Sequence, residues 1–456
     1  MNFKAAYFIG IGGAGMSAIA RFFSKKGHVV KGYDKVSTRL TDFLKIEGID
    51  INFEDDINSI PSDILELSPD ELLLVYTPAI PDTHAQLSHL KSLGHTPIKR
   101  AELLGQITRD SQSLAISGTH GKTSTTAILA HILDGTPNGC NAFLGGIAAA
   151  NNSNLYQHPD AQWTVVEADE FDRSFHHLNP SHGLITSLDP DHLDIYGSPE
   201  AFIEGFKIFQ GQISGQTLVA SPLSPTFPNA QSYGLETDST NPNHFAYDIT
   251  HTSSGISCSI SLDNGSHTIE DLKIPLFGEH NLENAVGAAA LAHLAETPHD
   301  IISERLQSFP GIYRRFQIHV NTENRVYIDD YAHHPTEIAK TIEAVREHFP
   351  NRNLTVIFQP HLYSRTQDQL EGFCKELAKA DQLFLLPIYP AREESIPGVN
   401  TQLILDNISH PHAKLSTINS IFENLKAYSV DVVLTLGAGD IDTLVPQMKE
   451  FASMDA

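Results

Sequence analysis

The sequence predicts an α/β protein of about three domains, and three observations support this. The chain has 456 residues, and about 150 residues per domain is typical, so each domain can bury its own core. Short apolar runs alternate with helix-like segments, which is typical of βαβ units on a parallel sheet. Two glycine-rich loops each follow a predicted strand and open a predicted helix. This length and pattern exclude a small disulfide scaffold.

Charge and composition restrict the partners. With 30 Lys+Arg against 55 Asp+Glu, the net charge of −25 argues against nonspecific binding to nucleic-acid phosphates or an anionic membrane. Three widely spaced cysteines fit a reducing compartment. The N-terminus lacks the pattern of a signal peptide, and no apolar stretch reaches the roughly 18 to 20 residues of a membrane span. We therefore expect a cytoplasmic protein in which local donors hold any anionic ligand.

Residues 1–111 form the first predicted domain, which is Rossmann-like. The strand AAYFIG leads into the glycine loop GIGGAG (residues 10–15), and Asp34 ends the next strand about 20 residues downstream. Such glycines let backbone N–H groups approach a pyrophosphate at a helix N-terminus, and an acid at this distance can bind a ribose hydroxyl. The loop predicts a dinucleotide-like ligand and leaves NAD and a nucleotide sugar open.

Residues 112–312 form the predicted central domain, a P-loop ATPase-like parallel sheet with a β insertion. The phosphate loop SGTHGKTS (residues 117–124) lies between the strand SLAIS and the helix TSTTAILAHIL. Backbone N–H groups there can surround phosphates, Lys122 can reach the β and γ oxygens, and the Thr123 hydroxyl can ligate Mg²⁺. The loop is a shortened variant, because Ile116 stands where GxxxxGK[ST] has its first glycine. It predicts triphosphate binding.

Two acidic clusters follow strands of the central domain. Glu167 opens EADEFD after one strand, and His192 lies within DPDHLD after the next. Because these strand ends share the sheet edge with the phosphate loop, we expect Glu167 and His192 to hold Mg²⁺ together with Thr123. We expect the other aspartates of these clusters to be solvated or to cap helices.

Three further segments carry weaker signals. Residues 214–278 are polar, contain a DNG hairpin signal and have no motif that predicts chemistry. In the next helix Asn281 and Asn284 share one face, where their amides either cap and pack or read a purine edge. Arg314 and Arg315 are either exposed linker charges or phosphate contacts.

Residues 313–456 form the third predicted domain, which is also Rossmann-like. Polar clusters follow three of its strands: DDYAHHP (329–335), FQPHLYSRT (358–366) and GAGD (437–440). Such a sheet places its ligand crevice at the carboxyl ends of its strands. Histidine, tyrosine and arginine side chains there could bind a carboxylate and steer an amine.

Taken together, these segments resemble the Mur ligase family across essentially the whole chain. The matching segments occur in family order and are GIGGAGMSA, SGTHGKTSTT, VVEADEFDRSF, DPDHLDIYG, GEHNLENAVGAAA, YRRF, DDYAHHPTEI and FQPHLYSRT. The resemblance implies that domain one holds a UDP moiety, that domain two binds ATP and Mg²⁺ (or Mn²⁺), and that domain three completes the ATP site and receives an amino acid. It implies ATP-dependent ligation of L-alanine to UDP-N-acetylmuramate through an acyl phosphate in peptidoglycan biosynthesis, by a monomer or weak homodimer.

The resemblance also assigns roles to individual residues. The residues implied for the UDP-substrate are Gly12, Gly13, Ala14, Gly15, Met16, Asp34 and Thr77. Those implied for ATP are Gly118, Thr119, His120, Gly121, Lys122, Thr123, Ser124, His280, Asn281, Asn284, Arg315 and Asp330. The implied metal ligands are Thr123, Glu167 and His192. The implied amino-acid residues are Tyr331, His333, His361 and Arg365, and the implied catalytic residues are Lys122, His192, His333 and Arg365.

Two positions bear on the branch of the family. Ligases that add later residues have a carbamylated lysine after DHLD, whereas this chain has Phe206 there and Lys207 one residue on, which resembles the alanine-adding branch. Many members of that branch have Arg after the His of PHxYxRT, but this chain has Leu362, so Arg365 is left to hold more of the alanine carboxylate.

Three alternatives remain open at this stage. A recycling ligase that joins UDP-N-acetylmuramate to a tripeptide is the near one. An NAD(P)-dependent dehydrogenase would use the N-terminal glycine loop, but it does not need the phosphate loop. A noncatalytic nucleotide-binding regulator would not need Lys122, Thr123, Glu167 and His192. The general base for amine attack also stays open, with His192 and His333 as candidates.

Overall fold

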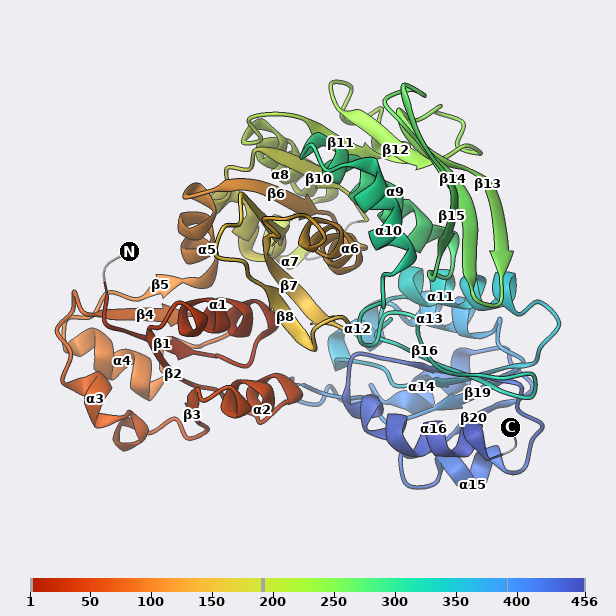
Figure 1. Cartoon of the computed structure of the whole chain (residues 1–456). Coiled ribbons are helices and arrows are strands. Elements are labelled where there is room, and N and C mark those ends of the chain that lie inside the picture. The colour runs from red at the N-terminus through yellow and green to blue at the C-terminus, as the bar shows by residue number, and fades with distance from the viewer. Residues whose placement is uncertain (1–2, 190–192, 392, 455–456) are drawn as a thin grey trace. The chain divides into compact units, whose positions relative to one another are not determined.

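The computed structural model describes residues 3–189, 193–391 and 393–454. It contains three sheets with helices packed on them (Figure 1), which confirms the predicted α/β class. The chain forms two compact units. The first contains Met1–Asp248, Cys258–Leu272 and Glu283–Pro310, and the second contains Ile249–Ser257, Lys273–Leu282 and Gly311–Ala456.

The first sheet is parallel and has the strand order β3-β2-β1-β4-β5, the order of a dinucleotide-binding half. Its strands are β1 (Ala5–Ile9), β2 (Val29–Tyr33), β3 (Asp50–Asn52), β4 (Leu72–Tyr76) and β5 (Ile98–Lys99). Its helices are α1 (Ala14–Lys25), α2 (Arg39–Ile46), α3 (Ser62–Leu65), α4 (Ala85–Ser92) and α5 (Arg100–Arg109). Alternation along β1 feeds two cores: Ala6 and Phe8 pack with α1 and α5, and Tyr7 and Ile9 pack with α3 and α4.

The second sheet has ten strands in the order β15-β14-β13-β12-β11-β10-β6-β9-β7-β8. The strands are β6 (Gln112–Ser117), β7 (Asn141–Ala148), β8 (Ser153–Tyr156), β9 (Trp163–Ala168), β10 (His182–Ile185), β11 (Thr217–Ala220), β12 (Gln231–Leu235), β13 (His244–Thr252), β14 (Gly255–Leu262) and β15 (His267–Ile274). The helices that follow them are α6 (Lys122–Asp134), α7 (Leu193–Tyr196), α8 (Pro199–Gly211), α9 (Glu279–Leu294) and α10 (His299–Gln307). Strands β9, β6 and β10 are parallel neighbours, so the loops after them share one edge. The neighbouring strands β14 and β15 form the hairpin that the DNG signal predicted.

Within the first unit, α1 packs on β7 and β8 (Figure 1). The buried amide of Asn154 on β8 donates to the carbonyl of Ala14 at 2.7 Å and to the Ser17 hydroxyl at 2.8 Å. Because Ala14 is the first residue of α1, these bonds hold the N-terminal glycine loop against strand β8 of the second sheet.

The third sheet lies in the second unit and has the order β16-β17-β21-β18-β19-β20. Strand β16 runs antiparallel to β17, and the other neighbouring strands of this sheet are parallel. Its strands are β16 (Gln317–Asn321), β17 (Val326–Asp330), β18 (Leu354–Phe358), β19 (Gln382–Leu385), β20 (Ala413–Leu415) and β21 (Val432–Leu436). Its helices are α11 (Pro335–His348), α12 (Tyr363–Asp368), α13 (Leu370–Leu377), α14 (Thr401–Asn407), α15 (Ile421–Leu425) and α16 (Val445–Ser453). Helices α11, α13 and α14 share one core with the sheet and α15 and α16 another, because the strands alternate.

In the part of the chain that the structure describes, no helix combines the length and apolar character needed to cross a membrane. The three cysteines are free thiols, two of them buried.

Candidate active site

The phosphate loop connects β6 to α6 and depends on two glycines. Gly118 has φ +127° and Gly121 has φ +82°, in the left-handed region that favours glycine. A Cβ at Gly118 would lie 2.1 Å from the Thr186 hydroxyl and 2.8 Å from the backbone nitrogen of Ser187. The chain can therefore approach β10 this closely only with glycine at position 118.

The N-terminus of α6 is suited to bind an anion. Gly121 is the N-cap and has no side chain to cap the first-turn amides, which have no partner within a helix. These amides and the positive end of the helix dipole favour a phosphate. The loop that presents them is fixed from β10, because the His120 amide donates to the Ser187 hydroxyl at 2.8 Å.

Lys122 is held by a carboxylate that the sequence analysis did not select. Its ammonium lies 2.7 Å from Glu170 Oε2 and 3.0 Å from Glu170 Oε1, and it also donates to the carbonyl of Thr119 at 3.3 Å. Burial opposes the charge of Lys122, but Glu170, Asp169 and Glu167 outweigh burial and raise the pKa of the ammonium. The position of Glu170, in an acidic run directly after β9, is a signal that could have identified it.

Glu167 lies beside Thr123, as the metal prediction requires. The Thr123 hydroxyl donates to Glu167 Oε2 at 3.2 Å, and the Gly145 amide donates to Oε1 at 2.5 Å. A hydroxyl and a carboxylate are the hard oxygen donors that Mg²⁺ prefers. The third predicted ligand, His192, lies outside the described residues.

The N-terminal glycine loop is shaped by Asp34. The Gly12 amide donates to Asp34 Oδ2 at 2.8 Å and the Val36 amide to Oδ1 at 3.2 Å. A Cβ at Gly12 would lie 2.9 Å from Asp34 Oδ2. The buried carboxylate therefore fixes the glycine loop, and a ribose contact by the same side chain stays a prediction.

One cavity of about 330 Å³ connects the two loops. Its lining includes five predicted UDP-substrate residues, Gly13, Ala14, Gly15, Met16 and Thr77, together with Lys122 and Glu167 of the predicted central domain. Arg100, at the start of α5, also lines it and donates to Asp169 Oδ2 at 3.2 Å. Arg100 was not predicted as a site residue, although it directly follows the end of strand β5. The cavity brings two predicted binding regions into one space.

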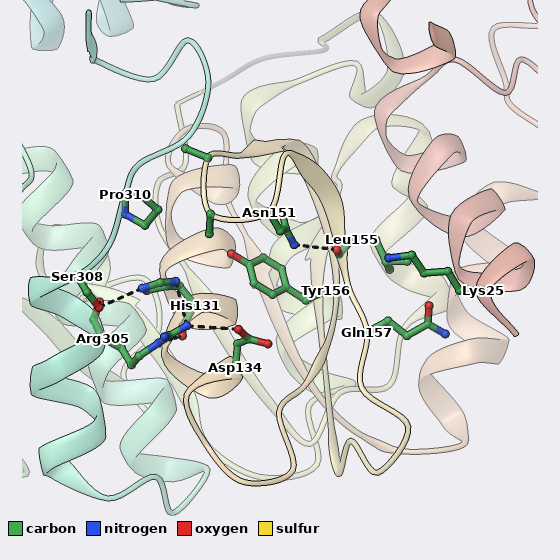
Figure 2. Close-up of a pocket in the computed structure, with 12 residues that line it drawn as sticks. Lys25, His131, Asp134, Asn151, Leu155, Tyr156, Gln157, Arg305, Ser308 and Pro310 are labelled. Atoms are coloured by element: carbon green, nitrogen blue, oxygen red, sulfur yellow. Dashed lines mark hydrogen bonds and ion pairs between the residues drawn. The ribbon is translucent and has the colours of Figure 1, made fainter. Parts of the chain in front are cut away.

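A second cavity, of about 590 Å³, is a weaker candidate (Figure 2). Its Arg305 is engaged in the fold, since it donates to the carbonyl of His131 at 2.7 Å and to Asp134 Oδ2 at 3.3 Å. Burial, with Arg305 adding to it, lowers the pKa of His131 to about 4. No predicted site residue lines this cavity among the described residues.

The predicted adenine-proximal residues occupy the first turns of α9. Within the first unit, Asn284 accepts from the Thr125 hydroxyl at 3.1 Å and lies against Gly121. Within the second unit, the Asn281 amide donates to the carbonyl of Phe277 at 2.9 Å. Burial, with Lys340 adding to it, lowers the pKa of His280 to about 4. Both asparagines thus pack or cap, and purine recognition stays a prediction.

Arg314 and Arg315, which precede β16, make different contacts. Arg314 is a structural residue, because it donates to Asp329 Oδ2 at 3.2 Å and to the carbonyl of Gly439. The Arg315 guanidinium lies 5.2 Å from the centre of the Tyr331 ring, and its phosphate contact stays a prediction.

Asp330 is buried at the end of β17 and binds its own backbone. Its oxygens accept from the amides of Phe316 at 2.5 Å and Ala332 at 2.7 Å. Burial raises the pKa of this carboxyl to about 6, against the opposing effect of Arg315 and the two amides. A ribose hydroxyl would therefore have to share a carboxylate that already accepts two backbone hydrogen bonds. The predicted ribose contact of Asp330 stays a prediction.

The four predicted amino-acid residues lie together within the second unit. His333 is 5.3 Å from the Tyr331 ring and 6.0 Å from the His361 ring, measured between centroids. Arg365 Nη1 lies 3.4 Å from His361 Nδ1. Burial, with His333 and Arg365 adding to it, lowers the pKa of His361 to about 4, so this imidazole is neutral at pH 7. In this cluster the guanidinium cation of Arg365 therefore lies beside the neutral imidazole of His361.

Two neighbours complete this cluster. Glu337, which the sequence analysis missed, lies 3.2 Å from His333 Nδ1, one helical turn further along the chain. Leu362 is the N-cap of α12 and has φ +72°, a conformation that is costly for a residue with a Cβ. Its position directly before α12 fixes where that helix begins.

The position of the carbamylated lysine belongs to an aromatic core. Phe206 on α8 is fully buried, 5.1 Å from the rings of Phe175 and Phe202, and Lys207 is exposed. Neither side chain offers a buried ligand at this place in the fold.

Comparison with known proteins defines the class. The profile of the Mur ligase family, catalytic domain, matches residues 5–112, that of the Mur ligase middle domain matches 116–292, and that of the Mur ligase, glutamate ligase domain, matches 314–439. The chain belongs to the Mur ligase family, as its motifs predicted.

Individual relatives are similar over nearly their whole length. A Porphyromonas gingivalis protein named UDP-N-acetylmuramate--L-alanine ligase is 45% identical over 454 residues, which cover 98% of this chain and 99% of the relative. A protein of the same name from Christiangramia forsetii is 44% identical over 451 residues, 98% of each chain. The solved structure of a UDP-N-acetylmuramate-alanine ligase from Thermotoga maritima has the same fold, with a TM-score of 0.82, 24% identity and coverage of 99% and 100%. A murein peptide ligase from Psychrobacter arcticus follows at a TM-score of 0.70, 20% identity and 98% of both chains.

Proposed function

We propose that this protein joins L-alanine to UDP-N-acetylmuramate in peptidoglycan synthesis, with conversion of ATP to ADP and phosphate. The observation that carries the proposal is the cavity of about 330 Å³, which is lined by the N-terminal glycine loop and by Lys122 and Glu167. A ligase needs its carboxylate substrate beside the triphosphate, and this cavity offers that arrangement. The names of the 44–45% identical relatives support the choice of amino acid and acceptor.

In the first step, the lactyl carboxylate of UDP-N-acetylmuramate attacks the γ-phosphorus of ATP. The bond from that phosphorus to the β,γ-bridging oxygen breaks, ADP leaves, and an acyl phosphate forms. Carboxylate and triphosphate repel each other, so the protein must neutralise charge and align the reactants. We assign this task to the first-turn amides of α6 and to the Lys122 ammonium, which lines the cavity.

A divalent cation fits the same place. The Thr123 hydroxyl and the Glu167 carboxylate lie 3.2 Å apart, and together with the predicted ligand His192 they would hold Mg²⁺ or Mn²⁺. When bound, this ion neutralises the charge on the β and γ oxygens. Glu167 also accepts from the Gly145 amide, which orients the carboxylate toward the hydroxyl.

In the second step, the neutral amine of L-alanine attacks the acyl carbonyl and phosphate leaves. The amine must first lose a proton, and His333 is the base that we propose. Its Nδ1 faces the carbonyl of Tyr331 at 3.1 Å and Glu337 Oε2 at 3.2 Å, so Nδ1 carries the hydrogen and Nε2 is left as the acceptor. Burial lowers the pKa of His333 although Glu337 opposes this effect, so the ring is neutral and able to accept a proton.

The alanine carboxylate requires a cation, and Arg365 is the residue that we propose. It lies beside neutral His361, at 3.4 Å, and position 362 supplies no second cation, since it is leucine. We place the reaction in the cytoplasm and expect a monomer or weak homodimer.

The deciding experiment measures ADP release with UDP-N-acetylmuramate and, in separate reactions, L-alanine, glycine, L-serine and the recycled tripeptide. We expect release to require both substrates and kcat/KM to be highest for L-alanine. If ADP is released with UDP-N-acetylmuramate and the tripeptide but with none of the single amino acids, the chain is a recycling ligase instead. Hydride transfer to NAD(P) without ADP release would overturn the class.

A further inference from the structure

Five side chains of the first unit form a cluster outside the candidate active site. His244 opens β13, Asp263 and His267 flank the turn between β14 and β15, His293 lies in the last turn of α9, and His299 opens α10. None of the five lines the cavity that holds Lys122. The mechanism therefore uses none of them.

The cluster has the composition and compactness of a metal site. The ring centroids of His267, His293 and His299 form a triangle whose three sides are each 5.1 Å. One possible ligand atom from each of Asp263, His267 and His293 lies within 4.8 Å of the others. Tetrahedral zinc with bonds of about 2.0 to 2.2 Å places its ligand atoms about 3.3 to 3.6 Å apart, so a shift of at most about 1.5 Å closes the set. His267 is exposed on the turn and can make that shift.

The shortest contact in the cluster marks the place of the cation. His293 Nε2 lies 2.9 Å from Asp263 Oδ2. A carboxylate oxygen accepts, so at this distance a hydrogen on Nε2 joins the two atoms. A metal ion takes the place of that hydrogen and keeps both atoms as ligands, and the neutral ring then carries its hydrogen on Nδ1.

Two further histidines, His299 and His244, contact the ligands and orient them. His299 Nε2 lies 3.0 Å from His293 Nδ1, which provides the acceptor that a metal-bound imidazole needs on its other nitrogen. The Asp263 amide donates to His244 Nδ1 at 3.4 Å, and His244 Nε2 faces Asp263 Oδ1 at 3.8 Å. Because His244 Nδ1 accepts a hydrogen bond, Nε2 carries the ring hydrogen and faces the carboxylate, so His244 positions Asp263.

A second group in the other unit, His251, Glu347 and His348, is less suited. Both nitrogens of His348 are engaged, because Nδ1 lies 2.7 Å from the carbonyl of Thr252 and Nε2 accepts from the Gly278 amide at 3.1 Å. A metal there would displace a backbone contact of a buried side chain. This group serves as a control.

We propose that Asp263, His267 and His293 bind a divalent transition-metal ion, with Zn²⁺ as the cation that suits their nitrogen and oxygen donors. His299 and His244 are positioning residues for this site. The ion joins the β14–β15 turn to the end of α9, two parts of the first unit. The site is separate from the candidate Mg²⁺ position at Thr123 and Glu167.

The test is isothermal titration of the full chain with ZnCl₂ in millimolar MgCl₂, which saturates sites built from oxygen donors. We expect one equivalent of zinc to bind to the unmodified protein and the thermal unfolding midpoint to rise with zinc. His267→Ala removes an exposed ligand, so the chain folds, binds zinc at least tenfold more weakly and loses the thermal shift. His299→Ala weakens binding about tenfold or more, as removal of an orienting partner does.

Two variants serve as matched controls. His412→Ala removes an exposed histidine elsewhere, and His251→Ala removes a ligand of the second group. Both are expected to bind zinc like the unmodified protein, and ADP release by His267→Ala is expected to be normal. The proposal is overturned if the unmodified protein binds no zinc under these conditions, if His267→Ala binds it equally well, or if His251→Ala loses it. None of these outcomes bears on the ligase activity, which ADP release reports separately.

Discussion

Lys122 and Glu170 form an ion pair at the phosphate loop, with the ammonium nitrogen 2.7 Å from Glu170 Oε2. The pair joins the first residue of α6 to the acidic run after β9, so it depends on the parallel pairing of β6 with β9. An incoming γ-phosphate offers Lys122 the same kind of oxygen as Glu170 does. The pair therefore keeps Lys122 charged and placed near the position where phosphate oxygens are expected.

Replacing Lys122 removes a donor from the developing charge. We expect Lys122→Ala to lower kcat for ADP release by about 10²-fold or more, the usual effect of losing one such donor. Lys207→Ala, which removes an exposed lysine of α8, is expected to be unaffected. Turnover near that of the unmodified enzyme, with the far-ultraviolet circular dichroism unchanged, would contradict the assignment of the phosphate loop.

The same pair contributes to stability. The side chains of Lys122 and Glu170 are only 16% and 3% exposed, so losing one partner leaves the other charge poorly solvated. We expect Lys122→Met and Glu170→Gln each to lower the free energy of unfolding by about 1 to 3 kcal/mol. The double variant should lose at least about 1 kcal/mol less than the sum of the single variants.

The control for this cycle is the pair Lys31 and Asp63, at 2.8 Å but 20% and 55% exposed. Its coupling energy is expected to stay below about 1 kcal/mol because water screens it. Urea denaturation measures all of these values. Equal coupling energies in the two pairs would show that burial does not set the strength of the Lys122 pair.

Gly118 tests the backbone of the phosphate loop. Gly118→Ala adds a Cβ at φ +127° and close to the backbone of Ser187, which costs about 1 to 3 kcal/mol of strain or displaces the loop. ATP binding should therefore weaken about 10- to 100-fold in isothermal titration. Gly211→Ala is the matched control, because a Cβ there meets nothing within 4 Å and its φ is not positive. Similar affinities in both variants would contradict the dependence on glycine.

The parts that could be predicted from the sequence are those with local causes. The glycines of both loops, the strand that precedes each loop and the helix that follows are fixed by short-range geometry, and their spacing predicted them. Lys122 and Thr123 follow from the same motif. The family and the α/β class could be predicted because these motifs recur in order along the chain.

The missed residues depend on which strands become neighbours. Glu170 and Arg100 reach the site because β9 pairs with β6 and because α5 starts beside the N-terminal glycine loop. Asp34 was predicted to bind a ribose hydroxyl from its distance to the glycine loop along the chain. That distance could not show that the Gly12 amide donates a hydrogen bond to its carboxylate. Likewise Asp263 and His293 belong to different elements, so no local pattern in the polar insertion predicted their contact.

Arg365 tests the amino-acid position. We expect Arg365→Ala to raise the KM for L-alanine about 10- to 100-fold, the cost of a lost charge-assisted contact, while the KM for ATP changes little. Arg346→Ala, which removes a partly exposed arginine paired with Asp381, is the control. An equal rise in both KM values would indicate a structural effect, and an unchanged KM for L-alanine would show that another group holds its carboxylate.

Asp330 predicts a pH dependence of stability. Its pKa is about 6 in the folded protein, against an ordinary value of 3.8, so the folded state binds this proton more tightly than the unfolded state does. The resulting stabilisation is fully present below about pH 4 and is lost as the pH rises through 6, and a shift of about two pH units corresponds to about 3 kcal/mol. Asp330→Asn stays neutral, so the free energy of unfolding of the unmodified protein minus that of the variant should fall by about this amount between pH 4 and pH 7. Urea denaturation across this range measures the difference, with Asp368→Asn, an exposed carboxyl in the same unit, as the control. A difference that is independent of pH, or that rises with pH, would mean that burial does not hold the proton on Asp330.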